Sequence, residues 1–267
     1  MNKFKLILII FLSVLIVIFS NFLIQSNDKT VETDSKVLSN KKIGWGIKRN
    51  SSHEQPDVGE TNRKILEENN GLFLGNKDKK FLYITFDEGY EAGYTKQILE
   101  TLKKNNVKAT FFITAHYVNT EPDLVKQMID EGHIVGNHTV NHKCMPELSE
   151  EELKKEVMDL HTSIYQKFGY DMKYLRPPKG EYSEKSIAYT NSLGYKTVMW
   201  SFAYEDWNEN KQPAEEASKK KIIENLHNGE IMLLHGNSKT NTNILDDVIK
   251  EAQNMGFTFK SLDEFEI

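Results

Sequence analysis

The sequence predicts an α/β protein built on a parallel β-sheet, either open or closed into a barrel. Short apolar runs rich in β-branched and aromatic residues alternate with stretches whose apolar residues recur at helical spacing, from about residue 81 to the end. The 267 residues suffice for one substantial domain of this class. No repeat or low-complexity tract interrupts the alternation.

The expected strands are short, and helical stretches separate most of them. The strand candidates are 81–86, 109–114, 134–137, 174–178, 197–202, 230–236 and 257–259. The clearest helix begins after Ser149, which has Glu152 three residues later, the pattern of a capping box. One apolar stripe then follows at i+3 and i+4 spacing: Leu153, Val157, Leu160, Ile164 and Phe168. A last helix is predicted from about Thr242.

The N-terminus differs from the rest of the chain. Two lysines precede an almost unbroken apolar run over residues 6–24, close to the length that spans a bilayer, with no small-residue cleavage pattern after it. Residues 1–27 are therefore predicted to be an uncleaved signal-anchor, with a cleaved signal peptide as the alternative. Residues 28–42 are polar and read as a linker. In either case we expect the folded part to be exported.

Composition excludes several classes of protein. The formal net charge of −5 argues against non-specific nucleic-acid binding, which needs a basic surface. Cys144 is the only cysteine, so no intramolecular disulfide can form. Cys144 lies close in sequence to His138 and His142 and could be a thiolate ligand or a nucleophile. Chain geometry supports neither role, so we treat the residue as incidental.

Ionisable residues follow five of the predicted strands. Parallel strands present their carboxyl ends at one face of the sheet, where α/β proteins assemble their sites. Five strands delivering such groups to one face predict a functional site there. The residues concerned are Asp87 and Glu88, His138 and His142, Arg176 and Lys179, Asp206 and Trp207, and His235.

These residue types suit metal-assisted hydrolysis. Two imidazoles in an H-x-x-x-H spacing, together with a carboxylate, can hold a divalent ion and leave positions open. Asp87 or Glu88 can act as base and His235 as acid, while Arg176 can fix a carboxylate through a bidentate pair. A structural ion pair for Arg176 and a core position for His235 remain alternatives. Trp207 is interpreted as a pocket wall, and the other histidines as structural or surface residues: His53, His116, His133, His161 and His227.

Five short motifs in this order resemble the polysaccharide deacetylase family (the NodB-homology domain, carbohydrate esterase family 4). They are TFDEG (85–89), HTVNH (138–142), RPPKG (176–180), EDW (205–207) and LLH (233–235). The resemblance implies a distorted (β/α) barrel as a single catalytic domain over residues 80–267. WGIKR, HEQPD, LFLGN and FDEGYEAGYT extend the similarity towards the δ-lactam-biosynthetic peptidoglycan de-N-acetylases of spore-forming bacteria. Residues 43–79 are then expected to form an N-terminal extension that packs on the barrel.

The resemblance also implies roles for single residues. Asp87 is implied as general base, oriented by Arg176, and His235 as acid, held by Asp206. His138 and His142 are implied as metal ligands, with Glu88 at the place where the family usually has an aspartate as third ligand. The backbone N–H of Lys179 is implied as an oxyanion donor, with Pro178 and Trp207 in the same substrate-binding region. Zinc suits the histidine pair best, and other divalent ions also fit.

The implied reaction is removal of acetyl from N-acetylmuramic acid in peptidoglycan, leading to the muramic δ-lactam of spore cortex. The partners expected are a peptidoglycan glycan strand and, for the N-terminal segment, a membrane, with no nucleic acid and a monomeric enzyme. The expected location is the outer face of the membrane or the intermembrane space of a forespore. Alternatives are the same chemistry on N-acetylglucosamine of peptidoglycan or chitin, an O-acetyl ester, and a non-catalytic glycan-binding pseudoenzyme. A metal-dependent phosphohydrolase would need more metal ligands or a basic phosphate-binding cradle than this sequence offers.

Overall fold

The computed structural model describes residues 37–50 and 52–267, and residues 39–267 form one compact unit. The predicted signal-anchor and most of the predicted linker lie outside the described residues. Within the described ranges, no helix has the length and apolar character that crossing a bilayer requires.

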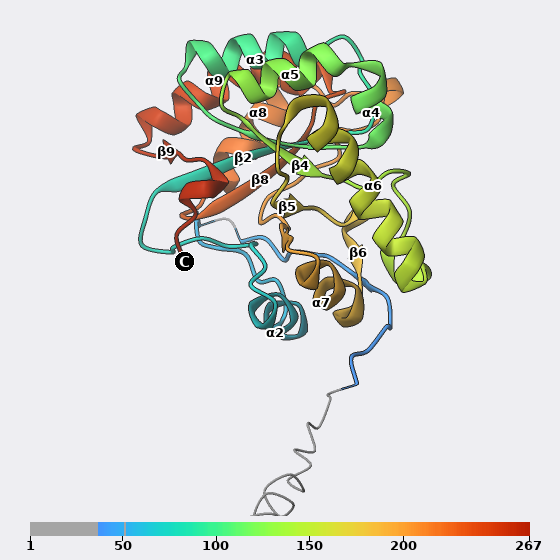
Figure 1. Cartoon of the computed structure of the whole chain (residues 1–267). Helices are drawn as coiled ribbons and strands as arrows, with labels where there is room; N and C mark the ends of the chain where they lie inside the picture. The colour runs from blue at the N-terminus through green and yellow to red at the C-terminus, as the bar shows by residue number, and fades with distance from the viewer. Residues whose placement is uncertain (1–36, 51) are drawn as a thin grey trace, which may run out of the picture. The chain divides into compact units, whose positions relative to one another are not determined.

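A curled parallel sheet forms the centre of the unit (Figure 1). Its strands follow the order β7-β5-β4-β3-β2-β8, and β9 pairs with the start of β2. Every pairing between these strands is parallel, as the alternation of strands and helices predicts. The strands are β2 (Phe81–Glu88), β3 (Thr110–Ile113), β4 (Ile134–Asn137), β5 (Tyr174–Leu175), β7 (Lys196–Thr197), β8 (Glu230–His235) and β9 (Thr258–Phe259).

The segment after β7 joins the two edges of the sheet. Val198 donates its N–H to Leu175 O at one edge, and Leu233 of β8 donates to Phe202 O at the other. Phe202 and Met232 form an isolated parallel bridge. The sheet therefore curls into an irregular half-barrel, which confirms the predicted distorted (β/α) architecture. The predicted strands at 174–178 and 197–202 are much shorter than expected, because two prolines and this crossing interrupt the ladder.

Helices cover the outer face of the sheet and bury the main core. Figure 1 shows α3, α5 and α9 packed together over the sheet. The capping box of Ser149 and Glu152 opens α6 as predicted, and the last helix starts at Lys239, a little earlier than predicted. The helices of this unit are α2 (Glu60–Glu68), α3 (Thr95–Lys104), α4 (Ala115–Thr120), α5 (Pro122–Asp130), α6 (Glu150–Phe168), α7 (Glu184–Ser192), α8 (Glu215–Asn225) and α9 (Lys239–Asn254).

Residues 43–79 lie in the same compact unit. Strand β1 (Ile43–Gly44) pairs antiparallel with β6 (Glu181–Tyr182), close to the RPPKG segment. Trp45 packs in a second apolar cluster with Tyr182, Ile187 and Met199, and its indole N–H donates to Trp200 O. These contacts hold the N-terminal extension against the turn that carries Lys179.

Candidate active site

A cavity of about 1010 Å³ opens where the strands β2, β3, β4 and β8 end. This is the face on which the sequence predicts a site. The lining residues include Asp87, His138, His142, Lys179, Trp207 and His235. The cavity therefore brings together groups from all five predicted strand ends, Arg176 and Asp206 lying behind its wall.

The two carboxylates at the end of β2 point to opposite faces of the strand. Leu82, Ile84 and Phe86 belong to the core under the helices, and Glu88 continues that even-numbered face. Thr95 of α3 donates to Glu88 at 3.4 Å, and Glu88 does not line the cavity. Gly236 allows this packing, because a Cβ there would overlap the Glu88 carboxyl.

The expectation that Glu88 is a third metal ligand is therefore wrong in this geometry. Its side chain is buried on the helix side of the sheet, and Oε2 has no hydrogen-bond partner among the described residues. Burial raises the pKa of Glu88 well above its usual range, which favours the protonated form of the group. Of the two candidate bases, only Asp87 faces the cavity.

Asp87 is held by Arg176 from within the barrel. Arg176 Nη1 donates to Asp87 Oδ1 at 2.8 Å, and Nε donates to Val198 O at 3.2 Å. The pairing uses one nitrogen, not the predicted bidentate fork, since Nη2 has no partner among the described residues. Burial acts to raise the pKa of Asp87, but its interactions with Arg176, His138 and His235 outweigh burial, so the net pKa is lowered. Asp87 is therefore an ionised carboxylate at neutral pH.

The H-x-x-x-H segment forms a tight loop after β4. Thr139 N–H donates to Asn137 Oδ1 at 2.9 Å, and His142 N–H donates to Thr139 Oγ1 at 3.0 Å. Thr139 and His142 adopt positive φ values of 68° and 55°, which side chains adopt at a cost. The loop bonds make up for that cost and bring the two imidazoles to a ring-centroid separation of 4.8 Å.

Both imidazoles are suited to bind a cation. His138 Nδ1 must donate to the carbonyl of Arg176 at 2.9 Å, which leaves the Nε2 lone pair 3.4 Å from Asp87 Oδ2. Burial lowers the pKa of His138. Burial and the neighbouring His138 ring lower the pKa of His142 to about 4, so both rings are neutral near pH 7. A neutral Nε2 facing a carboxylate oxygen sets two acceptors against each other, an arrangement that a cation between them resolves.

The ligand set that these residues offer is nevertheless small. Within the described ranges, no three His, Cys, Asp or Glu side chains gather closely enough to hold an ion together. Structural and catalytic zinc sites commonly have three or more protein ligands. The geometry fits a divalent ion bound by the two imidazoles, with the remaining positions left to substrate and solvent.

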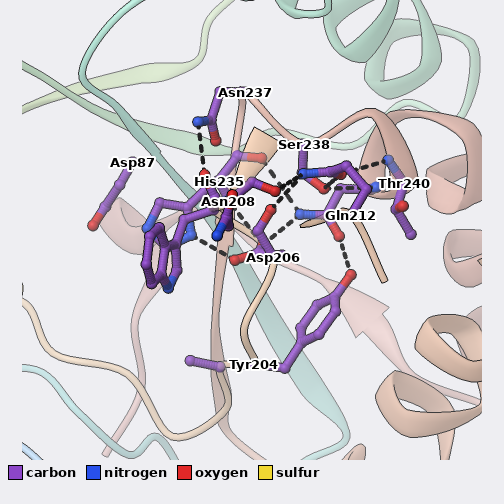
Figure 2. Close-up of polar contacts among 12 residues, drawn as sticks. Asp87, Tyr204, Asp206, Asn208, Gln212, His235, Asn237, Ser238 and Thr240 are labelled. Atoms are coloured by element: carbon purple, nitrogen blue, oxygen red, sulfur yellow. Dashed lines mark hydrogen bonds and ion pairs between the residues drawn. The ribbon is translucent and has the colours of Figure 1, made fainter. Parts of the chain in front are cut away.

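His235 and Asp206 form the second half of the site (Figure 2). His235 Nδ1 donates to Asp206 Oδ1 at 2.7 Å, and its backbone N–H donates to Oδ2 at 2.9 Å. Burial acts to lower the pKa of His235, but the hydrogen bond and charge of Asp206 raise it above the usual value. The histidine is thus held with Nδ1 engaged, and it carries a proton more readily than a free imidazole.

The remaining predicted residues separate into two groups. Lys179 lines the cavity with φ 58°, and Trp207 lines it with 53% of its surface exposed. Pro178 is buried and does not line the cavity, so its expected role in substrate binding stays a prediction. It starts the short 3₁₀ turn Pro178–Gly180 that places Lys179 at the wall.

Several lining residues were not predicted. His116, interpreted from the sequence as structural or surface, lies in the wall at the start of α4. Further lining residues outside the five motifs are Tyr90, Thr114, Trp200, Tyr204 and Asn237, and Asn141 lines the cavity from within HTVNH. All lie within a few residues of a motif or strand end, which is the signal that could have found them. The period of two in β2 could likewise have separated Asp87 from Glu88.

Comparisons with known proteins agree with this geometry. The polysaccharide deacetylase family matches residues 74–198. The chain is 40% identical over 231 residues to the peptidoglycan-N-acetylmuramic acid deacetylase PdaA of Bacillus subtilis, covering 86% of this chain and 88% of the relative. A peptidoglycan-N-acetylglucosamine deacetylase of Bacillus cereus is 33% identical over 192 residues, covering 70% of this chain and 88% of the relative.

A solved structure resembles the fold over most of its length. It is that of Bacillus subtilis PdaA, a family 4 carbohydrate esterase, with a TM-score of 0.83, 40% identity and coverage of 85% of this chain and 98% of that chain. The matching sequence, the parallel half-barrel and the strand-end site lead to one conclusion: the chain belongs to the polysaccharide deacetylase family of hydrolases.

Proposed function

We propose that this protein removes the acetyl group from N-acetylmuramic acid in peptidoglycan, in a reaction that depends on a divalent metal ion, and so leads to the muramic δ-lactam of spore cortex. The observation that carries the proposal is that two units line one cavity side by side, at the ends of the paired strands β2 and β8. Asp87 lies beside the histidine pair, and His235, its register partner on β8, is held by Asp206.

The chain's own groups supply the proton transfers. Asp87, ionised and fixed by Arg176, accepts a proton from the attacking water. His235 donates a proton to the leaving nitrogen through Nε2, which has no hydrogen-bond partner among the described residues. A divalent ion held by His138 and His142 would polarise the acetyl carbonyl, with zinc the first choice for imidazole ligands. The backbone N–H of Lys179 is proposed as a second donor to the developing oxyanion.

The preference for muramic acid rests on two supports. The match to the muramic deacetylase is longer than residues 80–267 and so includes part of the N-terminal extension. The second support is charge: muramic acid without its stem peptide carries a lactyl carboxylate that glucosamine lacks. Lys179 is exposed and lines the cavity, and the nearby carboxylate of Glu147 forms its ion pair with Lys42 at 3.0 Å. A lysine so placed favours the stem-free muramic residue.

Mass spectrometry of glycan fragments tests the proposal. Peptidoglycan strands with and without stem peptides are incubated with the full chain and Zn²⁺, and the products are digested to disaccharides. Loss of one acetyl from stem-free muramic acid is expected, with Lys179→Gln lowering kcat/KM on that substrate about two- to fivefold. Loss of acetyl from glucosamine alone would favour the alternative substrate, for which the similarity to the Bacillus cereus enzyme is the support.

Metal binding needs its own measurement. Calorimetric titration of the chelator-treated protein with Zn²⁺ is expected to show one site. His142→Ala should weaken it at least tenfold while the fold is kept, because His142 lies in a loop and not in the core. Unchanged affinity in His142→Ala would remove the histidine pair from the metal site.

The setting of the reaction follows from the N-terminal sequence. We propose an exported enzyme, anchored by residues 1–27 or released after their cleavage, that acts as a monomer on the outer face of the membrane or in the forespore intermembrane space. Cell fractionation of a tagged full-length chain, with N-terminal sequencing of the mature form, distinguishes anchor from cleaved signal.

A further inference from the structure

The carboxylate of Asp206 is held by more than His235. Its Oδ2 accepts the amide Nδ2–H of Asn241 at 2.5 Å, in addition to the backbone N–H of His235. Asp206 and Asn241 are each 1% exposed, so both groups are desolvated. The hydrogen bond from Asn241 is therefore not replaced by water when it is lost.

The orientation of the Asn241 amide is fixed from its other end. Tyr204 O–H donates to Asn241 Oδ1, and both side chains are buried. A carboxylate can only accept, so Nδ2 must be the atom that faces Asp206. A flipped amide would set its oxygen against that carboxylate. The result is a directed chain of donors: Tyr204 to Asn241, Asn241 to Asp206, with His235 donating to the same carboxylate.

Asn241 is mounted on a rigid element. It is in the first turn of α9, where its N–H donates to the N-cap hydroxyl of Ser238 at 3.2 Å. Asp206, in contrast, lies in an irregular segment between β7 and α8. A side chain on a helix can fix a carboxylate on a loop, because the helix backbone cannot follow the loop's fluctuations.

We propose that Asn241, oriented by Tyr204, is a positioning residue for the proton donor: it holds the Asp206 carboxylate in the rotamer that engages His235 Nδ1 and leaves Nε2 facing the cavity. The role as proton donor rests on the proposed function, while the positioning of the His235 ring does not. The competing explanation is a structural tie between α9 and the 203–208 segment.

A neighbouring amide provides a matched control. Gln212 Nε2 donates to the carbonyls of Asp206 and Asn208 at 3.1 and 3.0 Å, and Gln212 Oε1 accepts from Ser238 Oγ at 2.8 Å (Figure 2). Gln212 therefore ties the same segment to the same helix start, but it touches the backbone of Asp206 and not its carboxylate. A structural tie would be lost in Gln212→Ala as well as in a variant of Asn241.

The charged and titratable groups that act on His235 come from its own segment, from the neighbouring strand β2 and from the loop after β5. Asp206 and Asp87 raise the pKa of His235, and Arg176 lowers it. His138 and His142 are neutral and also lie near. When the Asp206 carboxylate turns away, His235 loses its strongest favourable partner. The pKa of His235 then falls, and proton donation fails at a lower pH.

The test compares Asn241→Ser, Tyr204→Phe and Gln212→Ala in the full chain. NMR titration of the His235 ring needs no substrate, and kcat and KM are measured with Zn²⁺ on stem-free glycan fragments across pH. Asn241→Ser should lower the titration midpoint of His235, move the alkaline limb of kcat to lower pH and reduce kcat about 10- to 100-fold, with little change in KM. Tyr204→Phe should do the same to a smaller extent, while Gln212→Ala leaves the midpoint in place.

Two outcomes would overturn the proposal. One is an unchanged His235 midpoint in both Asn241→Ser and Tyr204→Phe, with thermal unfolding showing intact folds. The other is an equal shift in Gln212→Ala, which would assign the effect to the position of the segment. If Asn241→Ser does not fold, Tyr204→Phe decides alone, since it removes one hydroxyl. A protein inactive on every glycan but with the predicted NMR shifts would disprove the proposed function and leave the positioning role standing.

Discussion

Strand β8 has a histidine–carboxylate pair near each of its ends, and the two pairs behave oppositely. At the carboxyl end, His235 Nδ1 lies 2.7 Å from Asp206 Oδ1. Before the amino end, His227 Nδ1 lies 3.2 Å from Glu230 Oε2. Burial lowers the pKa of His227 to about 4 and raises that of Glu230 well above its usual range, which favours the neutral form of each group. The pKa of His235 is instead raised.

The difference lies in where the second ring nitrogen points. His227 Nε2 is committed to Ser201 Oγ at 2.8 Å in a closed interior, and the side chain is 3% exposed. The side chain of His235 is 25% exposed, and it lines the cavity. Two histidine–carboxyl pairs on one strand therefore differ in their surroundings. The pair of His227 is enclosed in the interior, whereas His235, the proposed proton donor, lies at the cavity. Proximity of a histidine to an acid does not by itself define a catalytic pair.

The largest expected difference between the pairs is in catalysis. His235→Gln removes the proton donor and should lower kcat/KM about 10²- to 10⁴-fold. His227→Gln should keep kcat/KM within about threefold and lower the free energy of unfolding by about 1–3 kcal/mol, because it disturbs a buried bond. Deacetylation rates and thermal unfolding of both variants provide the measurement. Comparable loss of kcat/KM in both would erase the distinction.

The second largest difference is expected between the two carboxyl groups, Asp206 and Glu230. Asp206→Asn should reduce kcat about 10²-fold, since an amide cannot hold the imidazole in the same protonation state. Glu230→Gln should leave kcat unchanged and flatten the pH dependence of stability. Because the folded-state pKa of Glu230 is raised, its stabilising contribution is present below its unfolded pKa and is lost as pH rises through the folded pKa. Kinetics and unfolding measured from pH 5 to 9 would show whether the two acids separate in this way.

The pH profile of the unmodified enzyme sharpens the comparison further. As the proposed acid, His235 has to be protonated to act, and its pKa is raised above the ordinary value of about 6.5. The value of kcat should therefore stay constant up to a pH above about 6.5 and decrease at higher pH. In Asp206→Asn the same decrease should begin at a lower pH. An alkaline decrease of kcat that begins below about pH 6.5 in the unmodified enzyme would contradict the assignment of His235 as the acid.

The smallest effect is expected for Glu88. Glu88→Gln should leave zinc affinity and kcat within about twofold, since the side chain lies on the helix side of β2. It should also remove a destabilisation at alkaline pH, worth a few degrees in Tm, because the folded-state pKa of Glu88 is raised. Zinc titration and thermal scans at pH 6 and 9 check both parts. Tenfold weaker zinc binding would return Glu88 to the metal site.

Much of this molecule could be predicted from local patterns. The alternation of strands and helices, the capping box of α6 and the polar residues at five strand ends all depend on near neighbours in sequence. The order of five motifs was enough to identify the family and, through it, the half-barrel. Such features are readable because propensity and periodicity are fixed within a few residues.

The tertiary structure decided the rest. Arg176 forms a hydrogen bond through one nitrogen with Asp87, which lies 89 residues earlier in the sequence. The segment after β7 bonds to both edges of the curled sheet. Packing between distant segments decides which histidine faces solvent and which carboxylate faces the cavity. It also decides which amide supports Asp206. The sequence by itself determined which chemical groups are present at the strand ends. Only the folded chain decided their directions, because side-chain direction and burial depend on contacts that no local pattern contains.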